Sequence, residues 1–252
     1  MADLKEETTL DNSEENQVEE TVEPKRKAID PSLEGIQLFY EMNKKMITYV
    51  GGAVVVILGA FLFLKLYYIP EQEKEASNEL FWAETLFERD SFNLALKGGA
   101  MVMAADGQKQ MKGFEQIAEE YSITKSGSLA NYYAGVCYLR TGKFEQAIPF
   151  LEKYDGTDEI VSSIAIGAIG DCHMEMNHGD EAIKYYLKAA ENSHNNFTTP
   201  VYLQKAGLAY ELKANYTEAL SIYERIKKEY PNSSEGQSVE IRISKVKALG
   251  NL

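Results

Sequence analysis

The most chemically suggestive residues of this chain are an acid, a thiol and an imidazole in consecutive positions, Asp171, Cys172 and His173. A cysteine nucleophile needs a base within hydrogen-bond reach. Adjacent side chains on a helix point about 100° apart, so these three cannot work together if the segment is helical. We therefore expect no catalytic residues here and no enzymatic activity.

Two other patterns imitate a ligand site. His173 and His178 have no third metal ligand at helical spacing, so a metal site is not expected. Gly167 and Gly170 imitate a phosphate-binding loop but lie inside a helical pattern with no strand before it. The sequence thus predicts no metal, no cofactor and no small-molecule substrate.

The charge balance excludes one class of partner. The chain has 252 residues, with 26 basic and 39 acidic side chains and a net charge of −13. A nucleic-acid binder needs a basic excess to neutralise phosphates, and this chain has none. The hydrophobic fraction of 44% is enough for a core, but it is unevenly distributed.

One long segment, residues 46–64, has no charged side chain. A helix of that length rises roughly 28 Å, close to the hydrocarbon thickness of a bilayer. Tyr49 at one end and Tyr67 and Tyr68 at the other fit interfacial aromatic belts. A buried core helix would keep a polar stripe, and a cleavable signal would be shorter and followed by small residues. The sequence therefore predicts a transmembrane helix over residues 46–69.

Basic residues set the expected orientation. Lys44 and Lys45 adjoin the N-terminal end of the apolar segment, whereas only Lys65 lies at the other end. The positive-inside rule then places the N-terminal tail in the cytoplasm and residues 70–252 outside it.

The tail itself divides into two parts. Residues 1–29 form an acidic tail whose composition predicts disorder. Residues 30–45 form a juxtamembrane amphipathic segment, in which Asp30 and Pro31 begin a helix. That helix either lies on the inner membrane surface or simply prolongs the membrane helix.

Beyond Pro70 the pattern is one of amphipathic helices, and three segments resemble one another: residues 129–154, 164–190 and 201–226. Each has a glycine in its first helix, an alanine twelve positions later and a large apolar residue four positions further on. These residues are Gly135, Ala147 and Leu151; Gly170, Ala182 and Tyr186; and Gly207, Ala219 and Tyr223. The three glycines are 35 and 37 residues apart, and a period of this length is typical of stacked helix pairs.

This pattern resembles the tetratricopeptide repeat. In that family, small residues at these positions let the two helices of a hairpin approach closely. Tyr138 and Tyr210 match the family's aromatic position, His173 replaces it in the middle repeat, and Pro231 matches the closing proline. The resemblance implies an all-α fold in which a single transmembrane helix is followed by a tetratricopeptide-repeat solenoid over residues 70–252.

The flanks of the repeats indicate further helices. One covers residues 73–97 with a break at Asp90-Ser91, and another covers residues 114–121. We expect a polar, Gly- and Met-rich loop over residues 98–113. Ile241, Val246 and Leu249 predict a closing helix, as solenoids need a cap on the exposed end.

The two cysteines, Cys137 and Cys172, occupy equivalent repeat positions. Equivalent helices in stacked repeats lie roughly 8–10 Å apart, whereas a disulfide needs Cα atoms within about 7 Å. We expect two free, buried thiols. Asn196, Asn215 and Asn232 begin glycosylation sequons that matter only in a eukaryotic secretory pathway, and we favour a bacterial chain.

A stacked array of helix pairs makes a concave groove that holds a peptide or a partner protein. The resemblance implies eight groove-facing residues. They are Tyr132, Val136, Arg140, Asp171, Glu175, Gln204, Leu208 and Glu211. Their charges are of both signs, which favours a protein partner over a nucleic acid.

The whole layout, from about residue 35 to 250, resembles the YfgM family of bacterial inner-membrane proteins. That resemblance implies an ancillary subunit of the Sec translocon, with its repeat domain in the periplasm. Such a subunit works beside the membrane-anchored chaperone PpiD on emerging polypeptides. Two other hypotheses remain: a structural scaffold for a division, secretion or motility assembly, and a regulatory or enzymatic accessory that signals through its tail. A eukaryotic membrane protein, marked by glycosylation at Asn196, is a further alternative.

Overall fold

The computed structural model of the chain describes residues 31–104 and 107–252. The predicted tail, residues 1–29, and the proposed helix cap Asp30 lie outside the described residues. Contacts divide the chain into two units, Met1–Leu58 and Gly59–Leu252.

The apolar segment is helical over its whole length. Helix α1 is Pro31–Phe63, a π-helical turn follows at Leu64–Tyr68, and helix α2 is Ile69–Phe87. Residues 31–45 therefore belong to the same helix as the first part of the predicted membrane segment.

This helical stretch differs from a soluble core helix in its exposure. Its most apolar 18-residue window has a mean hydropathy of 2.4, and none of the residues in that window is buried. The exposed large apolar side chains between Ile36 and Tyr68 are 44–83% accessible. Within the described residues it is the one helix long and apolar enough to cross a membrane.

After α2 the chain forms helix α3, Phe92–Lys97, and then a β-hairpin. Strand β1, Gly98–Ala104, pairs antiparallel with strand β2, Gly107–Lys112. The expected loop over residues 98–113 is therefore wrong, and the body is helical apart from this hairpin in the part that the structure describes.

The hairpin is held in place by tertiary contacts along strand β2 and at the ends of the two strands. Gly98 has a positive φ of 74°, and a β-carbon there would lie 2.4 Å from the backbone nitrogen of Gly113. The Lys109 ammonium lies 2.8 Å from a carboxylate oxygen of Glu79 on α2, and Met111 is buried. Local sequence does not predict this pairing, because strand propensity depends on such packing.

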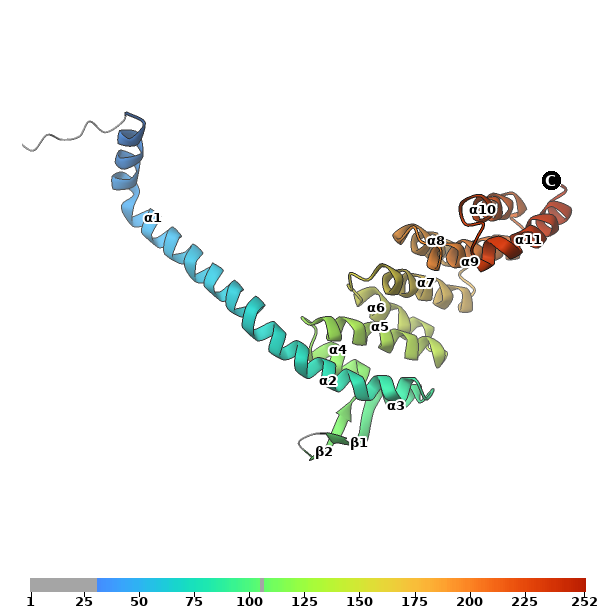
Figure 1. Ribbon diagram of the computed structural model, residues 1–252, viewed down its shortest axis with the longest axis horizontal. Helices are drawn as coiled ribbons and strands as arrows, with labels where there is room; N and C mark the ends of the chain where they lie inside the picture. Colours follow the sequence, from blue (N-terminus) through green and yellow to red (C-terminus); the bar gives the residue numbers. More distant parts are fainter. Residues whose placement is uncertain (1–30, 105–106) are drawn as a thin grey trace, which may run out of the picture. The chain divides into compact units, whose positions relative to one another are not determined.

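Helix α4, Phe114–Glu120, leads into three helix pairs that lie side by side, each helix against the next along the chain (Figure 1). The first pair is α5, Lys125–Arg140, and α6, Phe144–Lys153. The second is α7, Glu159–Glu175, and α8, Gly179–Asn192. The third is α9, Thr198–Leu212, and α10, Tyr216–Glu229.

The turns inside the three pairs have the same backbone conformation. Each contains one residue with positive φ, seven positions after the repeat glycine: Gly142 at 73°, Asn177 at 60° and Ala214 at 58°. This left-handed conformation suits glycine and asparagine but strains alanine.

The predicted glycine positions are the close-contact points within each pair. A β-carbon on Gly135 would lie 2.5 Å from Leu151 Cγ, one on Gly170 would lie 2.7 Å from the Tyr186 ring, and one on Gly207 would lie 2.5 Å from the Tyr223 ring. Ala147, Ala182 and Ala219 are fully buried. The repeat pattern therefore predicted the helix-pair packing correctly.

Helix α11, Ser234–Gly250, closes the body as expected. Its N-terminus is capped by the Ser233 side chain, which accepts a hydrogen bond from the Gly236 backbone at 2.9 Å. The inward face is Val239, Ile243 and Val246. Of the residues used to predict this helix, Val246 is buried, whereas Ile241 and Leu249 are exposed.

Candidate partner-binding groove

The first helices of the pairs, α5, α7 and α9, border a hollow of about 720 Å³. Five of the eight predicted groove residues line it: Tyr132, Val136, Arg140, Asp171 and Glu175. The remaining lining comes mainly from apolar and aromatic side chains. These are Leu139, Phe144, Ile164, Ala168, Met174, Tyr186 and Tyr202, together with Gly142 and Lys205.

The other three predicted residues lie on α9 and do not border the hollow. Gln204 and Leu208 are half-buried. The side chain of Glu211 is only 7% exposed, and it accepts a hydrogen bond from the Tyr223 hydroxyl at 2.6 Å. It also pairs with Lys245 and Arg242 of α11. Glu211 therefore joins α9 and α10 to the closing helix.

Charge interactions dominate the environment of Glu211. Burial on its own raises the pKa of this carboxyl, but the hydrogen bonds from Lys245 and Tyr223 and the nearby Arg242 charge lower it below its usual value. The ionised form is therefore stabilised by folding.

The floor of the hollow is aromatic. Tyr202 of α9 lies directly over Gly167 of α7, where a β-carbon would be 1.9 Å from the tyrosine ring. The Tyr202 and Tyr186 rings stack with centroids 6.5 Å apart. Burial, and then the Asp171 charge, raise the pKa of both phenols, so both stay protonated and neutral at physiological pH.

The charged groups on this floor neutralise each other. The Lys205 ammonium lies 2.7 and 2.8 Å from the two carboxylate oxygens of Asp171, and 5.6 Å from each of the Tyr186 and Tyr202 ring centroids. Asp171 also accepts a hydrogen bond of 2.7 Å from the Tyr186 hydroxyl. Tyr202 and Lys205 were not predicted from the sequence, although Lys205 follows Asp171 by about one repeat length.

The rim is different, because Arg140 and Glu175 are exposed and form no ion pair within residues 31–104 and 107–252. They occupy equivalent positions, five residues after Gly135 and Gly170 respectively. The hollow thus combines a neutral aromatic floor with one free positive and one free negative group at its edge.

The side chains of Asp171, Cys172 and His173 point in different directions, as helical geometry requires. Asp171 faces the hollow, Cys172 is fully buried, and His173 stacks on Tyr185 with ring centroids 5.3 Å apart. Burial raises the pKa of Cys172 and of Cys137 to about 12, so neither thiol is a nucleophile near neutral pH. Both cysteines are free and buried, as expected. Among the described residues there is no group of three potential metal ligands.

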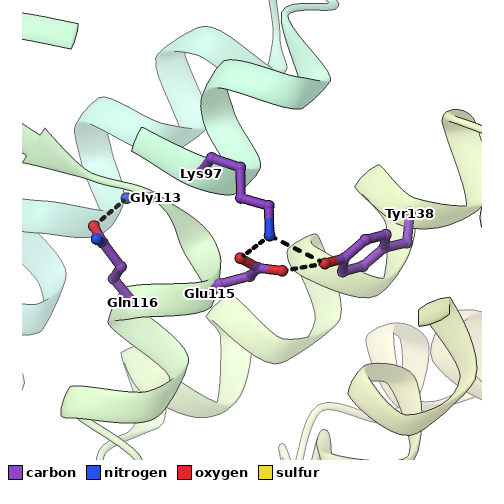
Figure 2. A network of polar contacts seen from close by, with 5 residues as sticks. All are labelled: Lys97, Gly113, Glu115, Gln116 and Tyr138. Atoms are coloured by element: carbon purple, nitrogen blue, oxygen red, sulfur yellow. Dashed lines mark hydrogen bonds and ion pairs between the residues drawn. The ribbon is translucent and has the colours of Figure 1, made fainter. Parts of the chain in front are cut away.

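A second polar cluster joins the region before the repeats to the first repeat (Figure 2). Lys97 of α3 lies 2.5 Å from Glu115 of α4, and the Tyr138 hydroxyl of α5 donates to the same carboxylate. Burial and the Glu115 bond raise the pKa of Tyr138, so its phenol is not activated. The neighbouring Gln116 side chain accepts from the Gly113 backbone and caps α4. This cluster links α3, α4 and α5.

Comparison with known families agrees with this geometry. Tetratricopeptide-repeat family models match residues 129–154, 165–196 and 202–233, one for each helix pair. These segments are tetratricopeptide repeats. Such repeats are typically non-catalytic scaffolds for protein–protein interaction.

Two similar proteins contain such repeats. A repeat-containing protein of Methanocaldococcus jannaschii, MJ1428, is 23% identical over 184 residues, covering 73% of this chain but only 29% of that protein. A crystal structure of repeats from a protein described as a kinesin light chain of Podospora anserina aligns with a TM-score of 0.46 at 10% identity. That alignment covers 73% of this chain and 87% of the other.

Proposed function

We propose that this protein is a non-enzymatic, membrane-anchored interaction protein whose repeat groove holds a segment of another polypeptide. We further propose that it is an ancillary subunit of the bacterial Sec translocon and acts with a PpiD-like chaperone. The observation that carries the first proposal is the hollow between α5, α7 and α9, with its neutral aromatic floor and unpaired rim charges.

The composition of the hollow supports a polypeptide partner. Tyrosine side chains give a large contact area with little loss of conformational freedom, and they are enriched at protein interfaces. Tyr132, Tyr186 and Tyr202 all line the hollow. Because Asp171 and Lys205 already satisfy each other, an apolar side chain can pack on this floor without leaving a buried charge unpaired.

The exposed apolar helix supports anchoring in a bilayer. In water, an unburied segment of this length and hydropathy would be costly, since each exposed apolar side chain loses the free energy of burial. A bilayer removes that cost. The basic residues Lys44 and Lys45 favour an N-terminus in the cytoplasm and a body in the periplasm.

The translocon assignment is supported by the likeness to the YfgM family, in which an N-terminal anchor precedes a repeat body of this size. An anchor would keep the groove close to the channel exit and raise its effective concentration there. No catalytic group is needed for this role.

The test is affinity purification of the full-length protein from membranes in a gentle detergent, with partners identified by mass spectrometry. We expect the Sec channel and a membrane-anchored periplasmic chaperone. Recovery of a different envelope assembly without the channel would contradict the translocon assignment and favour a scaffold that binds one folded partner.

A truncated form separates the roles of anchor and body. Deletion of residues 1–69 should give a soluble body that no longer purifies with the membrane complex. If the truncated body still recovers the complex, the body rather than the anchor makes the main contact.

A further inference from the structure

We propose that the groove selects an extended peptide segment carrying an acidic and a basic residue about three positions apart, with apolar residues between them. This inference rests on the proposed function, because it specifies the ligand of the same groove. The two unpaired charges at the rim and the neutral floor between them support this ligand pattern.

The neutral floor of the hollow favours apolar residues in the ligand. Tyr132, Ile164 and Tyr202 line the hollow, and the Asp171 carboxylate is already paired with Lys205 and Tyr186. A charged ligand residue placed on this floor would be desolvated without a free partner. An apolar or aromatic residue would lose only its contact with water, which is favourable.

The two charged residues at the rim favour a ligand that carries one charge of each sign. Arg140 and Glu175 line the hollow, are exposed, and have no ion pair within the described residues. Arg140 attracts an acidic group of the ligand, and Glu175 attracts a basic one. A segment with two like charges would gain one attraction and suffer one repulsion.

The repeat geometry gives the spacing. Arg140 and Glu175 occupy equivalent positions of consecutive repeats, and stacked helices lie roughly 8–10 Å apart. An extended chain in the polyproline II conformation advances about 3.1 Å per residue and turns once every three residues, so side chains three positions apart share a face and span this distance.

The experiment measures binding of three fluorescent peptides to the full-length protein in detergent micelles, by fluorescence anisotropy. All three have Gly-Ser flanks and differ only in a four-residue core. The cores are Asp-Leu-Phe-Lys, Asp-Leu-Phe-Asp and Lys-Leu-Phe-Lys. We expect the mixed-charge peptide to bind about three- to ten-fold more tightly than either other peptide, with the difference falling as salt rises.

Charge-reversal variants provide a test that does not depend on loss of binding alone. Arg140→Glu makes both rim charges negative and should shift the preference to the doubly basic peptide. Glu175→Lys makes both positive and should shift it to the doubly acidic peptide. A gain of binding to the complementary peptide cannot come from misfolding.

Matched controls reverse a charge away from the hollow. Lys184 and Glu191 are exposed on α8 and do not line it. Lys184→Glu and Glu191→Lys should keep the wild-type order of peptide affinities.

The outcomes separate this inference from the proposed function. Equal binding of all three peptides, unchanged in both rim variants, would overturn the charge selection while leaving the groove as a peptide site. Absence of binding by any peptide would contradict the peptide-holding role itself, and with it this inference.

Discussion

The ring of Tyr202 occupies the space that a side chain on Gly167 would need, with a β-carbon position only 1.9 Å from the ring. These residues come from α9 and α7, the first helices of consecutive repeats. Because Gly167 leaves this space open, the ring of Tyr202 can pack directly against α7 and line the groove. The glycine is therefore a determinant of the groove's shape as well as of helix packing.

Replacing this glycine should damage both stability and binding. In Gly167→Ala the new methyl group would push the buried Tyr202 ring aside, and we expect a loss of about 1–2 kcal/mol in the free energy of unfolding, measured by urea denaturation. Peptide binding to the groove should weaken as well. Gly179→Ala is the matched control, because its β-carbon would meet only the Lys213 side chain at 3.5 Å. An equally stable Gly167→Ala protein would show that the ring moves freely.

A second prediction concerns the stability effect of the turn residues with positive φ. Ala214 has a φ of 58° without being glycine, whereas Gly142 has a φ of 73° at the equivalent turn. Ala214→Gly should stabilise the protein by about 0.5–1 kcal/mol, and Gly142→Ala should destabilise it by a similar amount. Nothing lies within 4 Å of the β-carbon position of Gly142, so its effect is one of backbone conformation alone. Thermal unfolding of both variants tests this, and shifts of the same sign would refute it.

The closing helix should depend on pH through Glu211. Hydrogen bonds from Lys245 and Tyr223 outweigh burial and lower the pKa of this carboxyl in the folded state. Its contribution to stability is therefore complete above the unfolded-state pKa of about 4.3 and is lost as the pH falls through the lower folded-state pKa. We expect Glu211→Gln to cost about 1–2 kcal/mol at pH 7 and much less at pH 3.

The control for Glu211 is Glu240, which pairs with Lys227 but is 61% exposed. Glu240→Gln should change the free energy of unfolding by less than about 0.5 kcal/mol at either pH. If Glu211→Gln had the same small effect, α11 would not depend on this carboxylate.

The cysteines should be inert in the folded protein. With a pKa of about 12, Cys137 and Cys172 are ionised to roughly one part in ten thousand at pH 8. Iodoacetamide should label neither residue at pH 8 but both in guanidinium, as measured by intact mass. The mass without reductant should equal that with reductant. Rapid native labelling, or a two-unit mass difference, would contradict the buried, free thiols.

The contacts between the two helices of a single repeat could be predicted from the sequence. Gly135 and Leu151, or Gly207 and Tyr223, are close in sequence and recur with the same spacing, so their contact follows from the pattern. The pairing of Tyr202 with Gly167 was not predicted, because it joins different repeats and occurs only once.

The hairpin and the function of Glu211 were missed for related reasons. Strands β1 and β2 contain little that favours a strand, and their position depends on the ion pair from Lys109 to Glu79 and on the close approach of Gly98 to Gly113. Glu211 was expected in the groove from its repeat position, but the position alone does not show that α11 supplies Lys245. In both cases the deciding contact comes from a distant segment.

The central claim is that the groove between α5, α7 and α9 holds a segment of another polypeptide. The most direct measurement is photo-crosslinking in living cells with a benzophenone amino acid in place of Val136, which lines the hollow, or of Lys184, which does not. We predict crosslinks to polypeptide at position 136 and none at position 184. Equal crosslinking at both positions, or none at position 136, would contradict it.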